Sequence, residues 1–202
     1  SFENPFPSIQ AAINAASNGN TVSVAAGTYY ENINFSGKNI TVSGADSSNT
    51  IIDGGQNGSV VIFSSAENNS SVLKNFTITN GSGFVLADGS TKGGGIYASG
   101  AGPILENLII TGNAATRGGG VLSQGNNSMI LRNSRLHANN SIAGGGGLWL
   151  DGNRDSETFQ TIDNVVIHNN ASSSMGGGIK LYNNHSKITN CSVNNNSGSS
   201  GG

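Results

Sequence analysis

The feature that most constrains this chain is a run of three glycines that returns at a regular distance. Each run is followed by a short apolar segment, as in TKGGGIYASG at 91–100. The runs begin at Gly93, Gly118, Gly145 and Gly176, and Gly201–Gly202 starts another. Successive starts are 25, 27, 31 and 25 residues apart. A period of this length with short β-like segments predicts a solenoid, in which each coil packs only on its neighbours.

Two other interpretations of the triplets fit less well. A phosphate-binding loop occurs once, before a helix, and has a lysine after its last glycine. A flexible linker lacks the apolar segment that follows every triplet here. The triplets therefore punctuate a structural repeat.

Composition limits the partners. Only 10% of the 202 residues are charged, the net charge is −2, and the nine lysines and arginines are scattered. We expect no nucleic-acid partner, because no basic patch forms, and no membrane-spanning segment, because no apolar run is long enough. Cys191 is the single cysteine, so no disulfide framework is expected, and we interpret it as a small buried core residue. The surface, rich in Asn, Ser and Thr and poor in Lys, predicts an extracellular or cell-surface location.

A second phrase precedes each triplet and reads as strand, corner, strand: LKNFTIT from Leu73, and its equivalents from Leu105, Leu131, Ile162 and Ile188. Alternation along a strand places these first residues in one inward column and Ile78, Ile110, Leu136, Ile167 and Val193 in another. The corner is always asparagine, which tolerates the left-handed conformation and can bond to the same amide one coil away. We therefore predict an internal asparagine ladder of Asn75, Asn107, Asn133, Asn164 and Asn190.

The residue before each corner asparagine alternates in charge. These residues are Lys74, Glu106, Arg132, Asp163 and Thr189. Neighbouring coils lie about 4.8 Å apart, so an outward column of this kind would neutralise itself and fix the coil register.

The two ends of the chain differ. Ile9, Ala12, Ile13 and Ala16 have helical spacing, and the segment 8–18 is predicted to be a helix that caps the first coil. Shorter, irregular coils are expected over 20–71 and regular coils over 72–202, within a single domain of 1–202. The other end carries no cap, so we expect either a longer chain or end-to-end assembly with a neighbouring molecule.

The segment after each triplet supplies the candidate ligand surface. Its second and fourth residues are predicted to point outward from one sheet: Tyr97, Leu122, Trp149 and Lys180, then Ser99, Gln124, Asp151 and Tyr182. Exposed Tyr and Trp on a flat β surface can stack on sugar rings. Two alternatives stay open: the long connections 80–92 and 151–159 could fold over these aromatics, or the face could contact another protein.

Catalytic groups are sparse on this face. Hydrolysis of a glycosidic bond needs two positioned carboxylates, and only Asp151 is expected here, with Asp155 and Glu157 in the following loop. Asp151 and Lys180 are therefore weak catalytic candidates, with Tyr97 or Tyr182 as a possible acid for a lyase.

No cofactor or resident metal is expected. A Ca²⁺ site would need an acidic cluster, which the scattered carboxylates do not form. His137 and His168 fall in one outward column on adjacent coils, but two histidines without a third ligand make a poor metal site.

Taken together, these motifs resemble a known family. The corner asparagines and the opening SIQAAINAASNGNTVSVAAGTYYENINF (8–35) are similar to those of the right-handed parallel β-helix, or pectin-lyase-like, superfamily. The phrases GGGI, GGGV and GGGL, with Ile110-x-x-Asn113, Leu136-x-x-Asn139 and Ile167-x-x-Asn170, are similar to polymorphic outer-membrane-protein repeats. The resemblance implies an all-β right-handed parallel β-helix, and it implies that the outward face described above corresponds to the cleft face of polysaccharide-active members. This fold hosts lyases, hydrolases, adhesins and spacers, so the resemblance leaves function open.

The sequence favours an extracellular structural or adhesive β-solenoid that associates with itself or with other surface proteins, through its uncapped end or its aromatic face. The alternative is a carbohydrate-active protein, either a polysaccharide lyase or glycosidase or a sugar-binding module. It would use the face that bears Tyr97, Trp149, Asp151 and Lys180.

Overall fold

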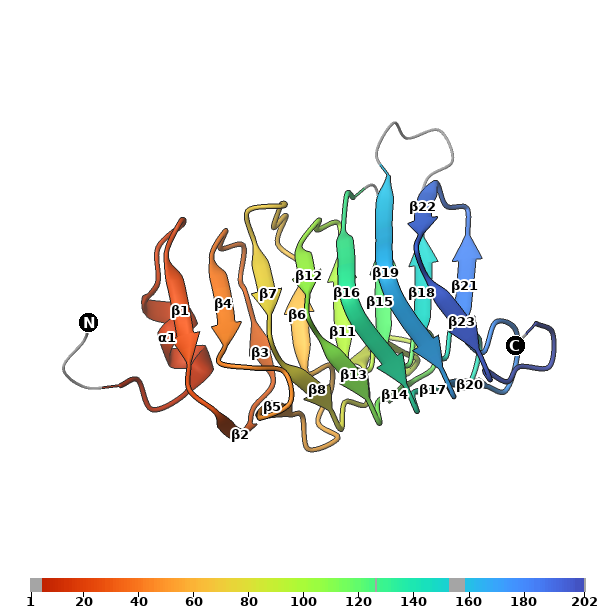
Figure 1. Ribbon diagram of the computed structural model, residues 1–202, viewed down its shortest axis with the longest axis horizontal. Coiled ribbons are helices and arrows are strands. Elements are labelled where there is room, and N and C mark those ends of the chain that lie inside the picture. Colours follow the sequence, from red (N-terminus) through yellow and green to blue (C-terminus); the bar gives the residue numbers. More distant parts are fainter. Residues whose placement is uncertain (1–4, 126, 153–158, 202) are drawn as a thin grey trace.

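The chain winds into a parallel β-solenoid of about six turns with one short helix. The computed structural model describes residues 5–125, 127–152 and 159–201. Figure 1 shows the strands side by side along the long axis, with helix α1 (Ile9–Ala15) beside the first strand. Within the described ranges, no helix has the length and apolarity needed to cross a lipid bilayer.

A long sheet contains two parallel columns of strands, and each coil adds one rung to both. The first column is β1 (Thr21–Val24), β4 (Thr41–Gly44), β7 (Val72–Lys74), β12 (Ile104–Glu106), the first halves of β16 (Ile130–His137) and β19 (Gln160–His168), and β22 (Ser186–Thr189). The second column is β2 (Gly27–Tyr30), β5 (Thr50–Asp53), β8 (Thr77–Thr79), β13 (Ile109–Thr111), the second halves of β16 and β19, and β23 (Ser192–Asn194).

The remaining strands complete each coil. The second large sheet is β3 (Ile33–Asn34), β6 (Val61–Phe63), β11 (Ile96–Ser99), β15 (Val121–Gln124), β18 (Leu148–Asp151) and β21 (Ile179–Tyr182). A small parallel sheet joins β14 (Ala114–Ala115), β17 (Asn140–Ser141) and β20 (Ala171–Ser172), and β9 (Phe84–Val85) pairs antiparallel with β10 (Thr91–Lys92).

The predicted capping helix is present but shorter than 8–18. Ser8 is its N-cap, and the Oγ atom accepts a hydrogen bond from the Ala11 amide at 3.0 Å. The Glu31 carboxylate accepts the next free amides, those of Ile9 and Gln10, at 2.9 and 3.0 Å. The helix ends at Ala15 rather than near Asn18, because Ala16 already has an extended backbone. Ile9 and Ile13 are buried against the first coil, so the helix covers the end of the core.

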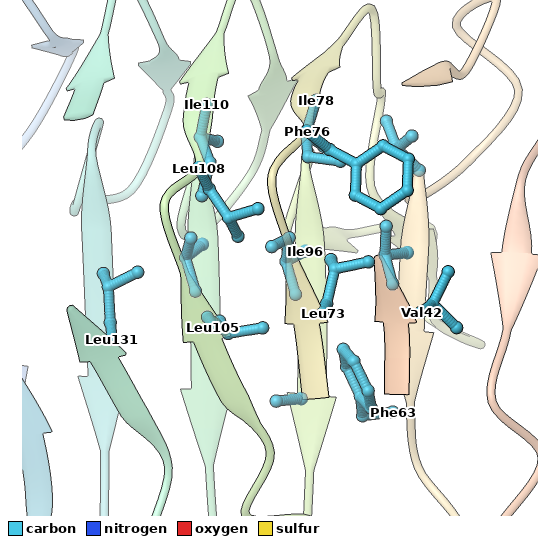
Figure 2. Close-up of a cluster of buried hydrophobic side chains, with 14 of the residues drawn as sticks. Val42, Phe63, Leu73, Phe76, Ile78, Ile96, Leu105, Leu108, Ile110 and Leu131 are labelled. Carbon is cyan, nitrogen blue, oxygen red and sulfur yellow. The ribbon is translucent and has the colours of Figure 1, made fainter. Parts of the chain in front are cut away.

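The inward columns form a continuous apolar core, as predicted. Register pairs connect Val42, Leu73, Leu105, Leu131 and Ile162 in one line, and all five are fully buried. Figure 2 shows part of this core, in which Leu73, Leu105 and Leu131 come from successive coils. Each coil buries its apolar side chains against the coil before and the coil after, which is the main stabilising contribution in a solenoid.

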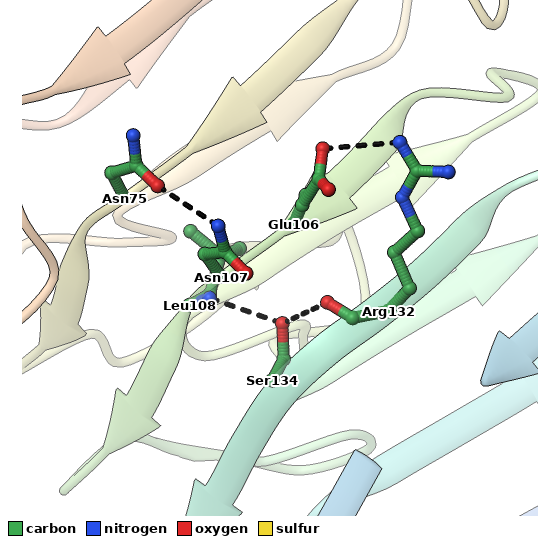
Figure 3. A network of polar contacts seen from close by, with 6 residues as sticks. All are labelled: Asn75, Glu106, Asn107, Leu108, Arg132 and Ser134. Atoms are coloured by element: carbon green, nitrogen blue, oxygen red, sulfur yellow. Dashed lines mark hydrogen bonds and ion pairs between the residues drawn. The ribbon is translucent and has the colours of Figure 1, made fainter. Parts of the chain in front are cut away.

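The corner asparagines have the predicted backbone but not the predicted burial. All five have positive φ, from 52° at Asn107 to 64° at Asn75. Asn107 Nδ2 donates to Asn75 Oδ1 at 3.2 Å, as Figure 3 shows, and Asn164 Nδ2 donates to Asn133 Oδ1 at 2.9 Å. Four of the five are exposed and Asn75 is half-buried, so the prediction of an internal ladder is wrong. In the left-handed conformation each corner asparagine points its side chain away from the core. Apolar side chains of the neighbouring strands fill the core instead.

A different column forms the buried ladder: Asn113, Asn139 and Asn170, continued by the half-buried Asn196. Asn139 Nδ2 donates to Asn170 Oδ1 at 2.9 Å and to the Ile110 carbonyl at 2.9 Å. Asn139 Oδ1 accepts both the amide and Nδ2 of Asn113, at 3.1 and 3.0 Å. Every polar atom of this side chain is therefore satisfied inside the protein, as a buried amide requires.

The glycine triplets lie where successive coils meet backbone to backbone. The first glycine of each has positive φ, from 59° at Gly93 to 64° at Gly118 and Gly176. A Cβ atom on Gly119 would collide with the carbonyl of Asn140 in the next coil, and one on Gly146 with that of Ala171. The triplets are therefore required by conformation and by close approach.

The outward charge column is in register, and one of its pairs is an ion pair. Glu106 and Arg132 are register partners, and their side chains approach to 3.1 Å (Figure 3). Asp163 instead accepts hydrogen bonds from Thr189 Oγ1 at 2.7 Å and Asn190 Nδ2 at 2.8 Å. Exposed pairs of this kind contribute little energy but disfavour a slipped register.

The last described coil differs from the others. Its inward residues are partly open to solvent: Leu181 is 50% exposed, and Ile188 and Val193 are also exposed. Cys191 is half-buried and packs against the core. Self-association through this coil stays a prediction, which light scattering at several concentrations would test.

Candidate functional site

The candidate site lies on the outer face of the second large sheet. Two outward columns are built by register pairs: Tyr97, Leu122, Trp149 and Lys180, and beside them Ser99, Gln124, Asp151 and Tyr182. The alternation after each glycine triplet is therefore as predicted. All eight side chains share one face because consecutive residues on a strand alternate and successive coils stack in register.

The aromatics on this face are covered by the chain itself. Tyr97 is 5% exposed, Trp149 is 8% exposed, and Leu122 is fully buried between them. They point outward from the sheet, as predicted, but they do not face solvent. Phe84 of β9 stacks on Tyr97 with ring centroids 4.9 Å apart and an angle of 11°. The connection 80–92 thus covers the face, one of the alternatives that the sequence left open; most of the connection 151–159 lies outside the described residues.

A polar network ties this cover to the sheet. Lys92 Nζ donates to Gln124 Oε1 at 2.6 Å. Gln124 Nε2 in turn donates to Tyr97 Oη at 3.1 Å and to Ser99 Oγ at 2.9 Å. The middle of the face is therefore held by internal contacts.

Four residues at the C-terminal end of the face form what we call the β18–β21 grid: Trp149, Asp151, Lys180 and Tyr182. Trp149 pairs in register with Lys180, and Asp151 with Tyr182. Tyr182 is 53% exposed, whereas Asp151 and Lys180 are half-buried. The grid thus combines an open aromatic ring, a carboxylate and an ammonium group on two neighbouring strands.

The polar groups of the grid lack good partners among the described residues. Trp149 Nε1 is buried without a hydrogen-bond acceptor. Lys180 Nζ contacts only the Met175 sulfur, a weak acceptor, at 3.3 Å. The Asp151 carboxylate makes no hydrogen bond or ion pair within the described ranges. Trp149 Nε1 is the buried one of these groups, whereas the half-buried side chains of Asp151 and Lys180 reach solvent and are open to a ligand.

Electrostatics set Asp151 apart from the other carboxylates. Burial raises the pKa of Asp151, and the positive charges of Lys92 and Arg117 oppose this. Burial, together with the charge of Arg117, lowers the pKa of Lys92. The guanidinium carbon of Arg117 lies 5.9 Å from the centre of the Trp149 ring. Two cations therefore border the grid on the side of the covering segment.

The other described carboxylates hold turns, caps or coil pairs together. Glu67, buried, accepts the amides of Gly37 and Ser65 at 2.8 and 2.9 Å. The remaining ones have the partners that follow: Glu31 with α1, Asp46 with Ser48, Asp53 with Asn80, Asp88 with Ser90, Glu106 with Arg132, and Asp163 with Thr189. Asp155 and Glu157 lie outside the described residues. Asp151 is thus the carboxylate that the described part of this face offers for chemistry, as the sequence indicated.

Metal-ligating residues do not gather at this face. Over the described ranges, no three of His, Cys, Asp and Glu lie close enough to hold an ion together. His137 and His168 are register partners on the outer face of the long sheet, away from the grid.

Comparison with known proteins agrees with this geometry. The family model described as a right-handed β-helix region matches residues 47–201. The chain belongs to this family. No curated protein matches it. Among solved structures it is similar to a pectin methylesterase in complex with a hexasaccharide, with a TM-score of 0.50 and 14% identity. That match covers 78% of this chain and 62% of the esterase chain, so this chain spans less than two thirds of the esterase, and the likeness shows the fold alone.

Sequence reasoning missed Lys92, Arg117 and Met175 in this right-handed β-helix. The three residues directly precede the glycine triplets, and Lys92 pairs with Arg117 across coils. The repeated phrases TKGGG and TRGGG carried the signal, since each places a cation immediately before a triplet. The side chains of these three residues lie beside the outward face: Lys92 bonds to Gln124, Arg117 lies over the Trp149 ring, and Met175 contacts Lys180.

Proposed function

We propose that this β-helix is an extracellular or cell-surface adhesive module that holds a polysaccharide against the β18–β21 grid without cleaving it. The observation that supports this is the exposed Tyr182 ring in register with Asp151, a half-buried residue whose carboxylate has no hydrogen-bond partner among the described residues, with Lys180 on the same two strands. Elsewhere on the same face, aromatic and polar side chains are occupied by contacts within the chain.

The chemistry of the grid suits a sugar. The Tyr182 ring offers an apolar face on which a pyranose ring can stack. Beside it, the Asp151 carboxylate accepts hydrogen bonds from hydroxyl groups, and the Lys180 ammonium donates them. Each of these two groups lacks a good partner within the protein and would gain a hydrogen bond to a ligand hydroxyl.

The scaffold holds the grid in place before a ligand arrives. β18 and β21 are paired in register over all four residues, and the glycine triplets beneath them fix the distance between coils. A preorganised surface binds with a smaller loss of conformational entropy, which suits an adhesive role.

Binding is tested with a panel of immobilised polysaccharides and the full chain. We expect Tyr182→Ala and Asp151→Asn to weaken retention on the bound polymer about tenfold each, since each removes one contact. Tyr30→Ala is the matched control, because Tyr30 is 78% exposed on β2, in the other large sheet. Equal loss in Tyr30→Ala and Tyr182→Ala, or no loss in either, would contradict the proposal.

A second candidate function is polysaccharide cleavage or ester hydrolysis, which the raised pKa of Asp151 favours. Burial raises the pKa of this carboxyl group, which is the direction that a general acid needs, and Lys180 on the next strand is the candidate base. Incubation with polyuronates, followed by assays for reducing ends, for unsaturated products by absorbance and for released methanol, tests this. Turnover that Asp151→Asn and Lys180→Ala abolish while polymer retention persists would replace the adhesive proposal with an enzymatic one.

A further inference from the structure

A lysine amine and a side-chain amide meet at the centre of the covered face, and the proposed adhesive role uses neither of them. Lys92, on β10, is half-buried, and its Nζ donates to Oε1 of Gln124, on β15, at 2.6 Å. The two residues are 32 positions apart in the chain and lie on neighbouring coils. A lysine amine is a nucleophile toward carbonyl carbons, so this contact places a nucleophile beside a possible acyl group.

The Gln124 carboxamide is held in one orientation. Its Nε2 donates to Tyr97 Oη at 3.1 Å and to Ser99 Oγ at 2.9 Å. These two bonds use both amide hydrogens, so Oε1 is left to face Lys92 and the amide cannot flip without losing them. Phe84 stacks on Tyr97, so the covering segment closes over the same place.

The amine is within reach of the carbonyl carbon. Gln124 Cδ lies one C=O bond, about 1.2 Å, from Oε1, so Lys92 Nζ lies at most about 3.8 Å from Cδ. Reacting atoms about 3–3.5 Å apart are in a near-attack arrangement. The hydrogen bond meets the edge of the amide, and rotations of the flexible lysine stem carry Nζ to its face while Gln124 stays fixed.

The surroundings favour loss of a proton from the amine. Lys92 and Arg117 pair across coils, so two cations lie side by side. Burial and the charge of Arg117 lower the pKa of Lys92, and the charges of Asp151 and Asp88 oppose this shift. Asp151 is the register partner of Gln124 on the next coil, and burial raises its pKa. The site therefore combines an amine that releases its proton more readily than usual with a carboxylate that accepts one more readily.

We propose that Lys92 and Gln124 react to form an amide bond between their side chains, with release of ammonia, which joins the covering segment covalently to the sheet. The Lys92 ammonium first passes a proton through solvent to Asp151. The Nζ lone pair then forms a bond to Gln124 Cδ, and the carbonyl electron pair moves to Oε1.

The second half of the reaction expels the original amide nitrogen. One proton passes from Lys92 Nζ to Gln124 Nε2, with Tyr97 Oη, which already contacts Nε2, as the relay. The carbonyl re-forms, the Cδ–Nε2 bond breaks, and its electron pair leaves with the nitrogen. The ammonia takes up the proton held by Asp151 and departs as ammonium. Atoms and charge balance, and nothing is oxidised or reduced.

Mass spectrometry of the intact, folded chain, kept at neutral pH until its mass no longer changes, tests the bond. We expect the chain to be lighter than its sequence by the mass of one ammonia molecule. Lys92→Arg and Gln124→Met should each restore the sequence mass, because each removes one reacting group. Lys187→Arg, an exposed lysine on β22, is the matched control and should retain the loss. An unaltered chain that keeps its full sequence mass, or a loss that persists in Lys92→Arg, would overturn the proposal.

Tryptic digestion of the unaltered chain locates the bond without any dependence on how the variants fold. Trypsin needs a free lysine amine, so the chain should resist cleavage between Lys92 and Gly93. The expected product is one branched peptide in which residues 75–117 and 118–132 are joined, with fragmentation assigning the branch to Lys92 and Gln124. A free peptide that ends at Lys92 in place of the branched one, or ammonia loss at another amide, would contradict the bond.

Discussion

Two columns of asparagine run along this molecule, and the same residue type does different work in each. The buried column, Asn113 to Asn196, uses the side-chain amide to join three coils at each rung. The exposed column, Asn75 to Asn190, uses the tolerance of asparagine for positive φ, and its side-chain bonds lie at the surface.

The difference shows which property of a repeated residue matters at a given place. In the buried column the environment excludes water. When a hydrogen-bond partner is lost there, no water molecule can take its place and the remaining polar group stays unsatisfied. In the exposed column water replaces any lost partner, and what matters is the cost of the left-handed backbone.

Asn139→Ala should lower the free energy of unfolding the most. It removes the acceptor for the amide and Nδ2 of Asn113 and the donor to the Ile110 carbonyl, all in the dry interior. We expect a loss of about 3–5 kcal/mol in the free energy of unfolding, measured by chemical denaturation. A loss below about 1 kcal/mol would mean that the ladder is not an energetic element of the core.

Asn196→Ala should lower the free energy of unfolding by less than Asn139→Ala does, because Asn196 makes equivalent hydrogen bonds from a half-buried position. Asn196 accepts from the amide and Nδ2 of Asn170 and donates to the Ile167 carbonyl, but solvent reaches this coil. We expect about 1–2 kcal/mol from the same denaturation experiment. A cost equal to that of Asn139→Ala would show that burial does not set the energy of a rung.

Asn133→Ala and Asn133→Gly together distinguish two contributions to stability in the exposed column: the side-chain hydrogen bond and the left-handed backbone. At φ 52°, alanine should cost about 1 kcal/mol, whereas glycine should cost close to nothing, since it adopts this conformation freely. Thermal unfolding of both variants measures the difference. If glycine is as costly as alanine, the surface bond from Asn164 carries the energy instead.

Acidification should produce the smallest effect on the exposed column, through Asp163, which accepts a hydrogen bond from Asn190. Hydrogen bonds from the Thr189 and Asn190 side chains lower the pKa of Asp163. The stability that this carboxylate contributes is therefore present above its unfolded pKa and lost as the pH falls through its folded pKa. The difference in unfolding free energy between the original chain and Asp163→Asn should be small at pH 7 and should shrink as the pH falls below the ordinary pKa of aspartate; a difference that grows on acidification would contradict this.

Much of the fold follows from the sequence, because the repeat is visible in single letters. The triplets, the inward columns from Leu73 to Ile162 and the capping helix at Ser8 all rest on local patterns that the structure repeats. Strand β2 was not expected, since GTYY (27–30) has no alternation of apolar and polar residues and is largely exposed.

The misplaced ladder has a specific cause. Asparagine recurs in two aligned positions of each repeat, and turn propensity explains only the first. Asn113, Asn139 and Asn170 were visible in the Ile-x-x-Asn and Leu-x-x-Asn phrases, but whether a side chain points inward at the end of a strand depends on how the next turn leaves the sheet.

The sequence predicted which residues share the outer face of the sheet, but it left open whether their side chains are exposed to solvent. Register and the outward direction of Tyr97, Trp149, Asp151 and Lys180 follow from alternation. The stacking of Phe84 on Tyr97 does not, because it depends on how a thirteen-residue connection (80–92) folds back over the sheet. A ligand role for these residues stays a prediction until binding is measured.

The glycine junctions make the windings interchangeable. Gly119 and Gly146 each face a carbonyl of the following triplet and a carbonyl of the small parallel sheet, so successive joints have the same chemistry. A chain lengthened or shortened by one complete winding, 25 to 31 residues here, would meet identical surfaces at the splice. Duplication of whole windings is therefore a route by which such a molecule can change its length while keeping both the helix at its beginning and the distant β18–β21 grid intact.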